Sequence, residues 1–379
     1  MAGKRSIFEE VGETRKQAAS PGGVSRDRGR GRRFLRVWLM TLFALVVVMI
    51  AVGGLTRLTD SGLSITEWAP VTGAVPPLSA EDWQAEFDAY REIPEYQLQN
   101  RGMSLEEFKF IYWWEWGHRQ LGRFIGLVWA VGFVGLLATR MMPPGWTGRA
   151  LLLGALGGAQ GAIGWWMVSS GLTEGRLDVA SYRLAVHLGL AFLILALIAW
   201  FVLRLGRDEA DLMSARREGD RRLKGMATGV LHLSFAQILI GALVAGIDAG
   251  RNYPDWPLMA GGFTPPAMWA LDPWWRNLFE NDGTVQFIHR MAGYLLLAVA
   301  VAAWLAGRRS ARTATRGAFH AMMAMMLLQI ALGIVTVLYS APWYFAIAHQ
   351  FGAVVLIVLI LRARFVSIYP LRQSVRGTA

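Results

Sequence analysis

Four histidines stand at matching places in four separate apolar segments of this chain. They are His118, His187, His289 and His349. Each lies at or just inside the start of a long apolar run, and the alternation of the runs puts all four starts on one side of a membrane. Ionisable groups at membrane depth are costly and usually functional. The pattern therefore predicts two pairs of imidazoles that bind metal.

The spacing of the histidines favours haem iron among the metals that imidazole binds. Zinc sites draw several ligands from short spacings and often add carboxylate or thiolate, whereas each of these histidines is alone on its segment. One imidazole from each of two facing helices is the geometry of bis-histidine haem b. His232 and His320 have no matching partners, and we do not expect them to bind metal.

Glycines and arginines accompany the histidines. Three histidines are followed, after three or four residues, by a glycine on the same helix face, where a flat macrocycle can approach: Gly122, Gly293 and Gly352. Three arginines lie at the outer water boundary, where they can meet haem propionates through charge-assisted bonds: Arg119, Arg123 and Arg290. Ordinary snorkelling at the interface is the alternative interpretation of these arginines.

Glu115 distinguishes the first pair of histidines from the second. It precedes His118 by three positions, so both side chains project from one helix face. The equivalent position before His289 is Gln286. Glu115 is either a structural partner or solvated acid at the interface, or a catalytic acid/base or cation stabiliser. The asymmetry predicts that one haem site reacts and the other only carries electrons.

The composition is that of a membrane protein. Of the 379 residues, 54% are hydrophobic and 17 are tryptophan, which a soluble domain of this size does not show. Eight apolar segments are long enough to span a bilayer: 35–56, 114–139, 149–169, 184–206, 226–247, 285–306, 318–339 and 343–362. We therefore expect an all-α integral membrane protein, with eight transmembrane helices arranged as two tandem pseudo-symmetric four-helix bundles.

The net charge of +11 reflects membrane topology rather than nucleic-acid binding. Lys and Arg gather in the two terminal tails and in every second connection between the apolar segments, and the positive-inside rule puts those regions in the cytoplasm. Both termini are then cytoplasmic, and the histidines lie toward the periplasmic side of a bacterial inner membrane. Acidic residues in the first 33 positions argue against a mitochondrial presequence. Zero cysteines exclude disulfides and thiolate metal sites.

The same pattern divides the chain into two halves with tails and a linker. Ser79 with Asp82 and Ser104 with Glu107 resemble helix N-caps, the second of a helix that continues into the next span. The expected parts are a disordered basic cytoplasmic tail (1–34), an N-terminal four-helix half (35–206) with a large outer loop (57–113), a cytoplasmic linker (207–225), a C-terminal four-helix half (226–364) and a cytoplasmic tail (365–379).

From about residue 35 to 364 the chain resembles the haem A synthase family. The motifs that carry the resemblance are GGLTRLTDSGLSITEWAPVTGAVPP at 53–77, EWGHRQLGR at 115–123, GALVAGIDAG at 241–250 and ENDGTVQFIHRMAGY at 280–294. The chain lacks the pair of outer-loop cysteines that some members carry. In this it is similar to the branch typical of mitochondria and alphaproteobacteria.

The resemblance implies an oxidoreductase that converts the C8 methyl group of haem O to the formyl group of haem A, for cytochrome c oxidase, by successive hydroxylations. Glu115 corresponds to the essential acid of the family. The residues implied to hold a haem b cofactor and its iron are His289 and His349, with Arg290 and Gly293. The residues implied to bind the substrate haem and its iron are His118 and His187, with Arg119 and Arg123.

The implied partners are haem O as substrate, the lipid bilayer, contact with the haem O synthase that supplies the substrate, and an electron acceptor of unknown identity. A homo-oligomer stays open, and no nucleic acid is expected. A di-haem b-type membrane cytochrome that passes electrons from quinol is the competing interpretation, because the histidines alone fit both. Glu115 in one half and the two long outer loops favour the enzyme. A transporter is less favoured, because no span has the expected Gly/Pro break at mid-membrane.

Overall fold

The computed structural model describes residues 22–172 and 176–372 and is all-helical over those ranges. Eight of its helices are long and apolar enough to cross a membrane. They are α1 (Gly22–Leu58), α4 (Leu105–Ala138), α5 (Thr147–Val168), α6 (Ser181–Leu205), α8 (Arg221–Gly246), α10 (Asp282–Gly307), α11 (Thr313–Leu338) and α12 (Trp343–Ile368). Each has one counterpart among the eight apolar segments expected from the sequence, and the fold class is confirmed.

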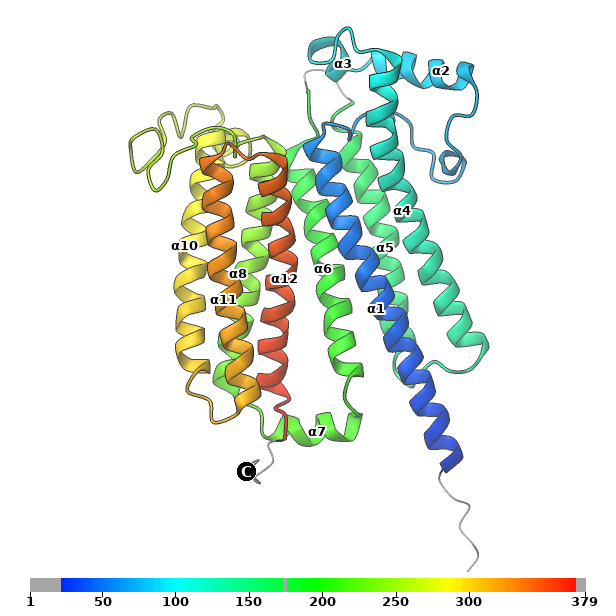
Figure 1. The fold of residues 1–379 in the computed structure, drawn as a ribbon, viewed down its shortest axis with the longest axis vertical. Helices are drawn as coiled ribbons and strands as arrows, with labels where there is room; N and C mark the ends of the chain where they lie inside the picture. The colour runs from blue at the N-terminus through cyan, green and yellow to red at the C-terminus, as the bar shows by residue number, and fades with distance from the viewer. Residues whose placement is uncertain (1–21, 173–175, 373–379) are drawn as a thin grey trace, which may run out of the picture.

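The eight helices form two rings of four, which stand side by side in Figure 1. In the first ring α1 packs on α4, α4 on α5, α5 on α6, and α6 returns to α1. In the second ring α8, α10, α11 and α12 follow one another in the same order. The rings meet where α6 packs on α8 and α12, and where α1 packs on α12. Because the α6–α8 and α12–α1 contacts are equivalent, the two halves are related by an approximate two-fold axis.

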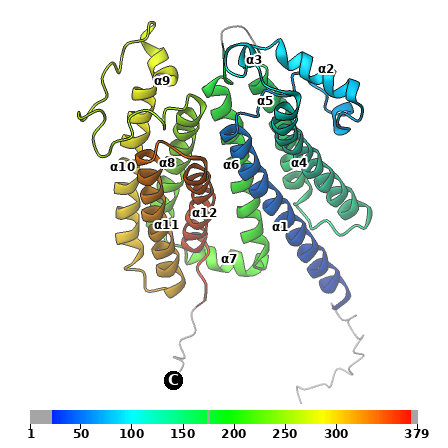
Figure 2. The ribbon, with the colours of Figure 1, turned by 45° about the horizontal axis from the view of Figure 1, so that its top comes forward.

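A small domain, which we call the cover domain (residues 72–98), covers the outer end of the first ring. It contains η1 (Thr72–Ala74), α2 (Ala80–Arg91) and α3 (Pro94–Leu98), and α4 rises above its neighbours to meet it (Figure 2). Ser79 and Ser104 begin α2 and α4 with full capping boxes, as predicted. Aromatic side chains from α2, α3 and α4 form a separate buried cluster, which includes Phe87, Tyr90 and Phe108. This domain fixes the loop between α1 and α2 against α4.

Several boundaries differ from the sequence expectation. The first helix begins at Gly22 instead of residue 35, and no proline interrupts it between these positions. The other residues of the expected N-terminal tail, 1–21, and the end of the C-terminal tail, 373–379, lie outside the described residues. The expected linker contains a helix, α7 (Glu209–Arg217), and the outer loop of the second half contains η2 (Trp274–Arg276) and α9 (Asn277–Glu280).

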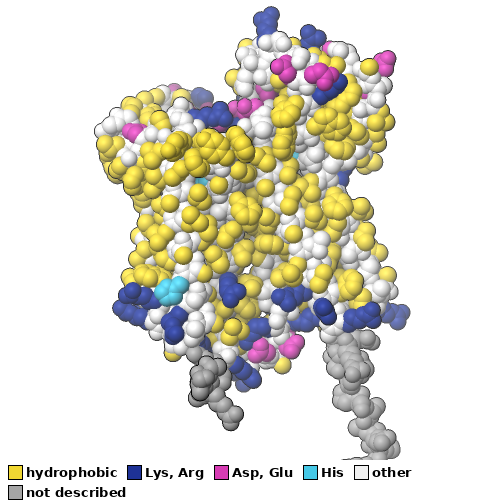
Figure 3. All heavy atoms as spheres, viewed as in Figure 1, with side chains coloured by type: hydrophobic (Ala, Val, Ile, Leu, Met, Phe, Trp, Pro, Cys, Tyr) yellow, Lys and Arg dark blue, Asp and Glu magenta, His cyan; other side chains and the backbone are white. Residues whose placement is uncertain are grey.

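Charge and hydropathy are layered along the helix axes. In Figure 3 a broad apolar band covers the middle of the molecule, and Lys and Arg gather at its lower end. Figure 1 places α7 and the described end of the C-terminal segment at that lower end, opposite α2 and α3. An apolar belt with one basic rim is the surface of a protein that crosses a bilayer with a fixed orientation.

Candidate functional site

The structure brings the four predicted histidines to the same end of the two rings. His118 is on α4, His187 on α6, His289 on α10 and His349 on α12. In each ring the two histidine-bearing helices stand diagonally, because α1 and α5, or α8 and α11, lie between them. His118 interacts electrostatically with His187, and His289 with His349. The predicted pairs therefore face each other across their own rings.

Each imidazole packs against a glycine on the preceding helix of its ring. A Cβ atom built on Gly53 of α1 would lie 3.2 Å from His118 Nε2. The other three glycines would place a Cβ atom close to Cε1 of their histidines: Gly164 at 2.9 Å from His187, Gly241 at 3.1 Å from His289, and Gly333 at 3.0 Å from His349. Any larger residue would displace the ring, so these glycines set the position of the imidazoles.

Three of the four histidines are held by a glutamine one turn before that glycine. Gln160 Nε2 donates to the main-chain oxygen of His187 at 3.0 Å and lies 3.2 Å from its Nδ1. Gln237 and Gln329 repeat this contact, at 2.9 Å to the main-chain oxygen of His289 and of His349, and at 3.1 Å and 3.2 Å to their Nδ1 atoms. The repeated motif is Gln-x3-Gly.

The motif is visible in the sequence, where aligning these helices on their glycines finds Gln160, Gln237 and Gln329. In α1 the equivalent position is Met49. No hydrogen bond to the His118 ring occurs within the described part of the chain. The helix that packs against His118 therefore has a methionine at the position where the corresponding helices of the other three histidines have a glutamine.

The glycines that follow the histidines accommodate these same side chains. A Cβ atom on Gly122 would lie 3.5 Å from Met49 Cε, and one on Gly293 would lie 3.5 Å from Gln237 Nε2. A Cβ atom on Gly352 would collide with Gln329 Oε1. The structure therefore gives these glycines a role in helix packing that the sequence argument did not include.

The donor set of each ring fits a haem held by two imidazoles. In residues 22–172 and 176–372 no group of three or more His, Asp or Glu side chains is arranged to hold a metal ion, as a structural zinc site would require. The amide oxygens of the three glutamines are buried and have no hydrogen-bond partner. Buried polar atoms are nearly always paired, so these three oxygens are polar positions that the described residues leave without a donor.

Glu115 is buried and holds the loop that follows α1. Its Oε2 accepts hydrogen bonds from Ser64 Oγ and from the main-chain nitrogen of Ile65, both at 2.8 Å. Its Oε1 accepts from Arg119 Nε at 3.0 Å and Nη2 at 2.6 Å. The side chain is 2% exposed. Every contact to the carboxylate is from a donor, and together these donors hold it in one place.

Arg119 and Arg123 bind the same loop through its carbonyl groups. Arg119 donates to Ile65 O and Glu67 O, and Arg123 donates to Ala69 O and Pro70 O, all at 2.8–3.0 Å. A guanidinium group has five N–H donors. Because these bonds and those to Glu115 and Gln120 do not use them all, Arg119 keeps one free N–H and Arg123 keeps two.

The second ring repeats this arrangement with reversed polarity. Gln286 takes the place of Glu115 and donates through Nε2 to Ala249 O and Asn252 O, both at 2.6 Å. Arg290 takes the place of Arg119 and donates to Gln286 Oε1 at 2.7 Å. The loop after α1 thus presents hydrogen-bond donors to the Glu115 carboxylate, whereas the loop after α8 presents carbonyl acceptors to the Gln286 amide. The predicted difference between the halves extends to the backbone around them.

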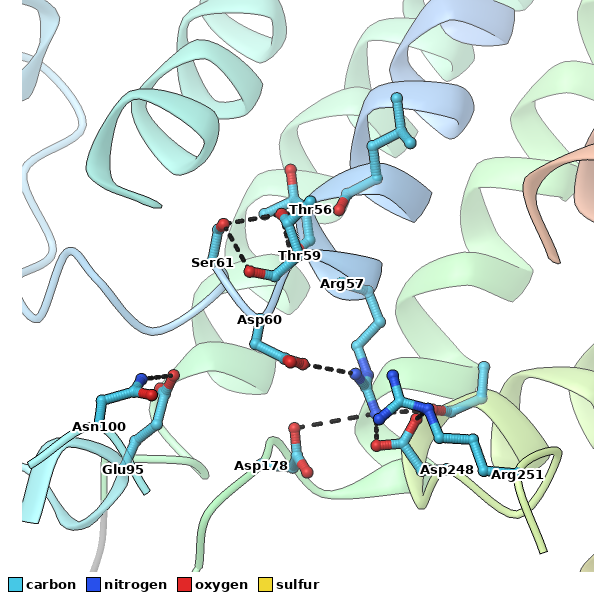
Figure 4. A network of polar contacts seen from close by, with 12 residues as sticks. Thr56, Arg57, Thr59, Asp60, Ser61, Glu95, Asn100, Asp178, Asp248 and Arg251 are labelled. Atoms are coloured by element: carbon cyan, nitrogen blue, oxygen red, sulfur yellow. Dashed lines mark hydrogen bonds and ion pairs between the residues drawn. The ribbon is translucent and has the colours of Figure 1, made fainter. Parts of the chain in front are cut away.

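Acidic groups gather at the outer end of the first ring, as Figure 4 shows. Arg57, at the end of α1, pairs with Asp60 at 3.2 Å and with Asp178 at 3.9 Å in its own half. It also pairs with Asp248 of the other half at 3.1 Å and donates to Ala245 O at 2.9 Å. One largely buried guanidinium group therefore joins the two rings.

Glu95 of α3 lies close to this cluster. It is 3% exposed, and its Oε2 has no hydrogen-bond partner. Burial, with repulsion from Asp60, Asp178 and Glu115, raises the pKa of Glu95 to about 8. Burial also raises the pKa of Glu86 on α2. The cover domain therefore holds two carboxyl groups with raised pKa values, Glu95 and Glu86, close enough to interact with Glu115.

The remaining two histidines lie apart from the pairs. His232 and His320 are both exposed, and His320 Nδ1 accepts a hydrogen bond from Trp304 Nε1 at 3.0 Å. Neither shares a ring interior with another histidine.

Comparison with known proteins agrees with this arrangement. Residues 36–361 match the family model described as cytochrome oxidase assembly protein. Among similar proteins, heme A synthase of Jannaschia sp. is 73% identical over 379 residues, covering all of both chains. Those of Dinoroseobacter shibae and Paracoccus denitrificans are 66% and 59% identical, and the matches cover at least 99% of both chains. The chain therefore belongs to the cytochrome oxidase assembly protein family, and its similar members carry the name heme A synthase.

Proposed function

We propose that this multi-pass membrane protein oxidises haem O to haem A, which cytochrome c oxidase requires. The observation that carries the proposal is the asymmetry between two otherwise equivalent rings: both have a histidine pair, but only the first has a carboxylate, Glu115, on the histidine's helix face. Full-length relatives with the name heme A synthase support the same activity.

We assign the resident haem b to the second ring. His289 and His349 would hold its iron, with Gly293 beside the first and Arg290 at the outer edge. Arg290 uses three of its five donors on Leu258, Tyr253 and Gln286, so two remain for a propionate. A haem with two protein ligands has no open position for oxygen and supplies electron transfer.

We assign the substrate haem to the first ring. His118 and His187 would bind its iron, and the free N–H groups of Arg119 and Arg123 would meet its propionates. The C8 methyl group loses two electrons and two protons in each of two hydroxylations, with water as the source of oxygen. The resulting geminal diol releases one water and leaves the formyl group. The four electrons need an acceptor, and a haem b held by His289 and His349 would supply electron-transfer chemistry toward it.

Glu115 would act on the substrate in one of two ways. Its carboxylate can take the proton from the attacking water, or it can stabilise positive charge that develops at the methyl carbon. Either role needs the carboxylate in a fixed place, and the bonds from Ser64, Ile65 and Arg119 hold it there. Glu95 and Glu86 lie near enough to interact with its charge.

The orientation follows from the basic rim. We place the α7 end of the molecule in the cytoplasm of a bacterial cell and the histidine pairs toward the periplasm, because Lys and Arg gather at the α7 end (Figure 3). Delivery of haem O by haem O synthase would then occur at or within the membrane, where the substrate's farnesyl chain is soluble.

The test is extraction of non-covalent haem from the purified protein, with identification by mass. Haem B together with haem O or haem A supports the proposal, whereas haem B alone favours a cytochrome that only carries electrons. Replacement of His289 or His349 by Ala should remove the low-spin haem b spectrum. If both variants kept that spectrum and normal haem content, the assignment of haem b to the second ring would be wrong.

A further inference from the structure

A pocket of about 420 Å³ lies between the start of α1 and the connection from α6 to α7. We call it the α1–α7 pocket. It is at the end of the molecule where α7 lies across the helices in Figure 1 and where Lys and Arg gather in Figure 3. The charged residues of its lining are Arg32, Arg33, Arg36, Arg207, Asp208 and Asp211. Cations therefore outnumber carboxylates in this pocket.

Two of the four arginines build the pocket. Arg32 donates to the main-chain oxygens of Leu205 at 3.2 Å and Arg204 at 2.7 Å, and also to that of Arg207. These bonds join α1 to the carboxyl end of α6, whose last carbonyl groups have no partner within the helix. Arg207 donates to Asp211 at 2.7 Å, which compensates its charge. Neither guanidinium group is left to bind a ligand with all its donors.

The other two arginines, Arg33 and Arg36, are exposed and have no hydrogen bond or ion pair with any described residue. Arg36 Nη2 would lie 3.5 Å from a Cβ atom on Gly206, so its guanidinium group rests against the connection between α6 and α7. Asp208 has no side-chain cap bond at the start of α7. Two free guanidinium groups and one free carboxylate leave the pocket with uncompensated positive charge.

An exposed apolar strip continues from these arginines along α1. Val37 lies one helical turn after Arg33, and Met40 lies one turn after Arg36, so each apolar side chain shares a face with its arginine. Val37 and Met40 are about half exposed, as is Phe34 beside them. The strip enters the apolar band of Figure 3 from its basic edge. A phosphate at this edge and an acyl chain in the band are the two parts of a phospholipid.

A second pocket at the same end of the molecule lacks free cations. It has a volume of about 430 Å³ and lies where the start of α8 meets the end of α12 and the connection from α10 to α11. Arg312 is the cation of its lining, and it donates to Glu218 Oε2 at 2.9 Å. Asp220 of this pocket accepts from Leu223 N at the start of α8. Position at the rim is therefore not enough to leave arginines unpaired.

We propose that the α1–α7 pocket binds the phosphate group of an anionic phospholipid, with Arg33 and Arg36 as its ligands and with an acyl chain along Val37 and Met40. A guanidinium group is planar, stays charged and binds phosphate through two parallel N–H groups. Basic pockets between transmembrane helices bind acidic lipid head groups by the same contacts. The site is separate from the proposed function, because it contains no residue of the histidine pairs or of the surroundings of Glu115.

The uncompensated charge predicts which lipid is preferred. A phosphatidylcholine has a phosphate group, but the ammonium group of the same head group cancels its charge. A phosphatidylglycerol has the phosphate charge alone. Because the pocket keeps a positive charge after its internal pairs are counted, we expect it to prefer phosphatidylglycerol.

The experiment titrates the full-length protein in detergent with phosphatidylglycerol or phosphatidylcholine of identical acyl chains and counts bound lipids by native mass spectrometry. Wild type should bind one phosphatidylglycerol more tightly than phosphatidylcholine. Arg33→Gln/Arg36→Gln should weaken phosphatidylglycerol binding by about 10–30-fold, since each basic residue near a membrane surface contributes a several-fold gain. Binding of phosphatidylcholine should change little. Both side chains are exposed, so the temperature of unfolding should stay that of the wild type.

Two further variants make the result specific. Arg216→Gln/Arg217→Gln removes the same charge from exposed positions of α7 outside the pocket, and it should keep the preference of the wild type. Arg33→Lys/Arg36→Lys keeps the charge and loses the paired N–H contact, so its affinity should lie between those of the wild type and the glutamine variant. Inorganic phosphate and glycerophosphoglycerol, which lack acyl chains, should not displace the lipid at millimolar concentration.

Equal binding of the two lipids by the wild type, or unchanged phosphatidylglycerol binding in Arg33→Gln/Arg36→Gln, would overturn the proposal. An equal loss in Arg216→Gln/Arg217→Gln would assign the preference to the charge of the whole rim instead of the pocket. Displacement of phosphatidylglycerol by inorganic phosphate would show a site for free phosphate and would overturn the assignment to a lipid.

Discussion

The Glu115 carboxylate is bound by four donors: two from Arg119, one from Ser64 and one from the Ile65 main chain. A glutamine in its place would turn its amide hydrogens toward one of these donor pairs. The second ring shows what an amide needs instead, since Gln286 faces two carbonyl oxygens. The charge of Glu115 and the conformation of the loop are therefore coupled.

Glu115→Gln should lower haem A formation by about 10²–10⁴-fold, the usual contribution of an acid/base group, while haem b stays bound in the second ring. The product analysis should show accumulated haem O or a hydroxylated intermediate. Ser64→Ala is the matched control, because it removes one contact to the loop and leaves the charge. An equal loss of activity in Ser64→Ala would mean that loop position, and not the carboxylate's charge, limits the rate.

Glu95 makes the stability of the cover domain depend on pH. Its folded-state pKa of about 8 exceeds the ordinary carboxyl value of 4.5 because the group is buried. Between these values the folded state holds a proton that the unfolded state has lost. Stability from this group is therefore fully present below about pH 4.5 and falls as pH rises toward 8, by about 1.4 kcal/mol per pH unit.

Limited proteolysis of the loop 57–113 should accordingly become faster between pH 5.5 and pH 8.5. In Glu95→Gln, which is neutral throughout, the rise should be much smaller. Glu92→Gln, at an exposed position on the same loop, should behave as the wild type. The same pH response in Glu95→Gln as in the wild type would show that other groups, such as Glu86 or Asp178, govern it.

Helix packing at glycine decides where the imidazoles lie. Gly241 of α8 would place an added Cβ atom 3.1 Å from His289 Cε1, which is closer than such contacts normally are. Gly229, on the same helix, has no atom within 4 Å of such a Cβ. Both glycines lie on α8, but only Gly241 faces a histidine, so Gly229 is a matched control for a substitution at Gly241.

Gly241→Ala should lower the haem b content of the purified protein and broaden or shift its low-spin spectrum, because the ring must move from its place. Gly229→Ala should leave both unchanged, although each substitution favours the helix by about 1 kcal/mol. The ratio of haem to protein is the measurement. Equal ratios for the two variants would show that the His289 ring has room to move and that Gly241 does not position it.

At the scale of the molecule, the two sites are joined through the interface of the rings. Gln350, the residue after His349, donates to Ile50 O of α1 at 2.7 Å. Three residues along α1, Gly53 contacts His118. This hydrogen bond therefore links the helix that carries His349 to the helix that packs on His118. Arg57 closes the outer side of the same interface.

The orientation of the whole molecule is testable by fusion. A reporter active only outside the cytoplasm should be active after Asp60 or Gly262 and silent after Glu218 or at Ala379, because the basic residues gather at the α7 end. The opposite pattern would place both histidine pairs on the cytoplasmic side and would reverse every argument about their depth.

The sequence by itself determined the spans, the helix caps and the four histidines. Hydrophobic length, capping residues and the spacing of single histidines are local properties. They can therefore be identified in the sequence without knowing which residues pack around them. Even the asymmetry of Glu115 and Gln286 is visible by comparing two segments of one chain.

Only the tertiary structure decided which groups surround those residues. The order of helices in each ring sets Gln237 and Gln329 against their histidines and sets Met49 against Gly122. Packing also turned the glycines after the histidines toward neighbouring side chains, and it directed Arg119 and Arg123 to loop carbonyls. The physical reason is that hydrogen bonds between helices depend on rotation and depth of both partners, which hydropathy along one helix does not specify.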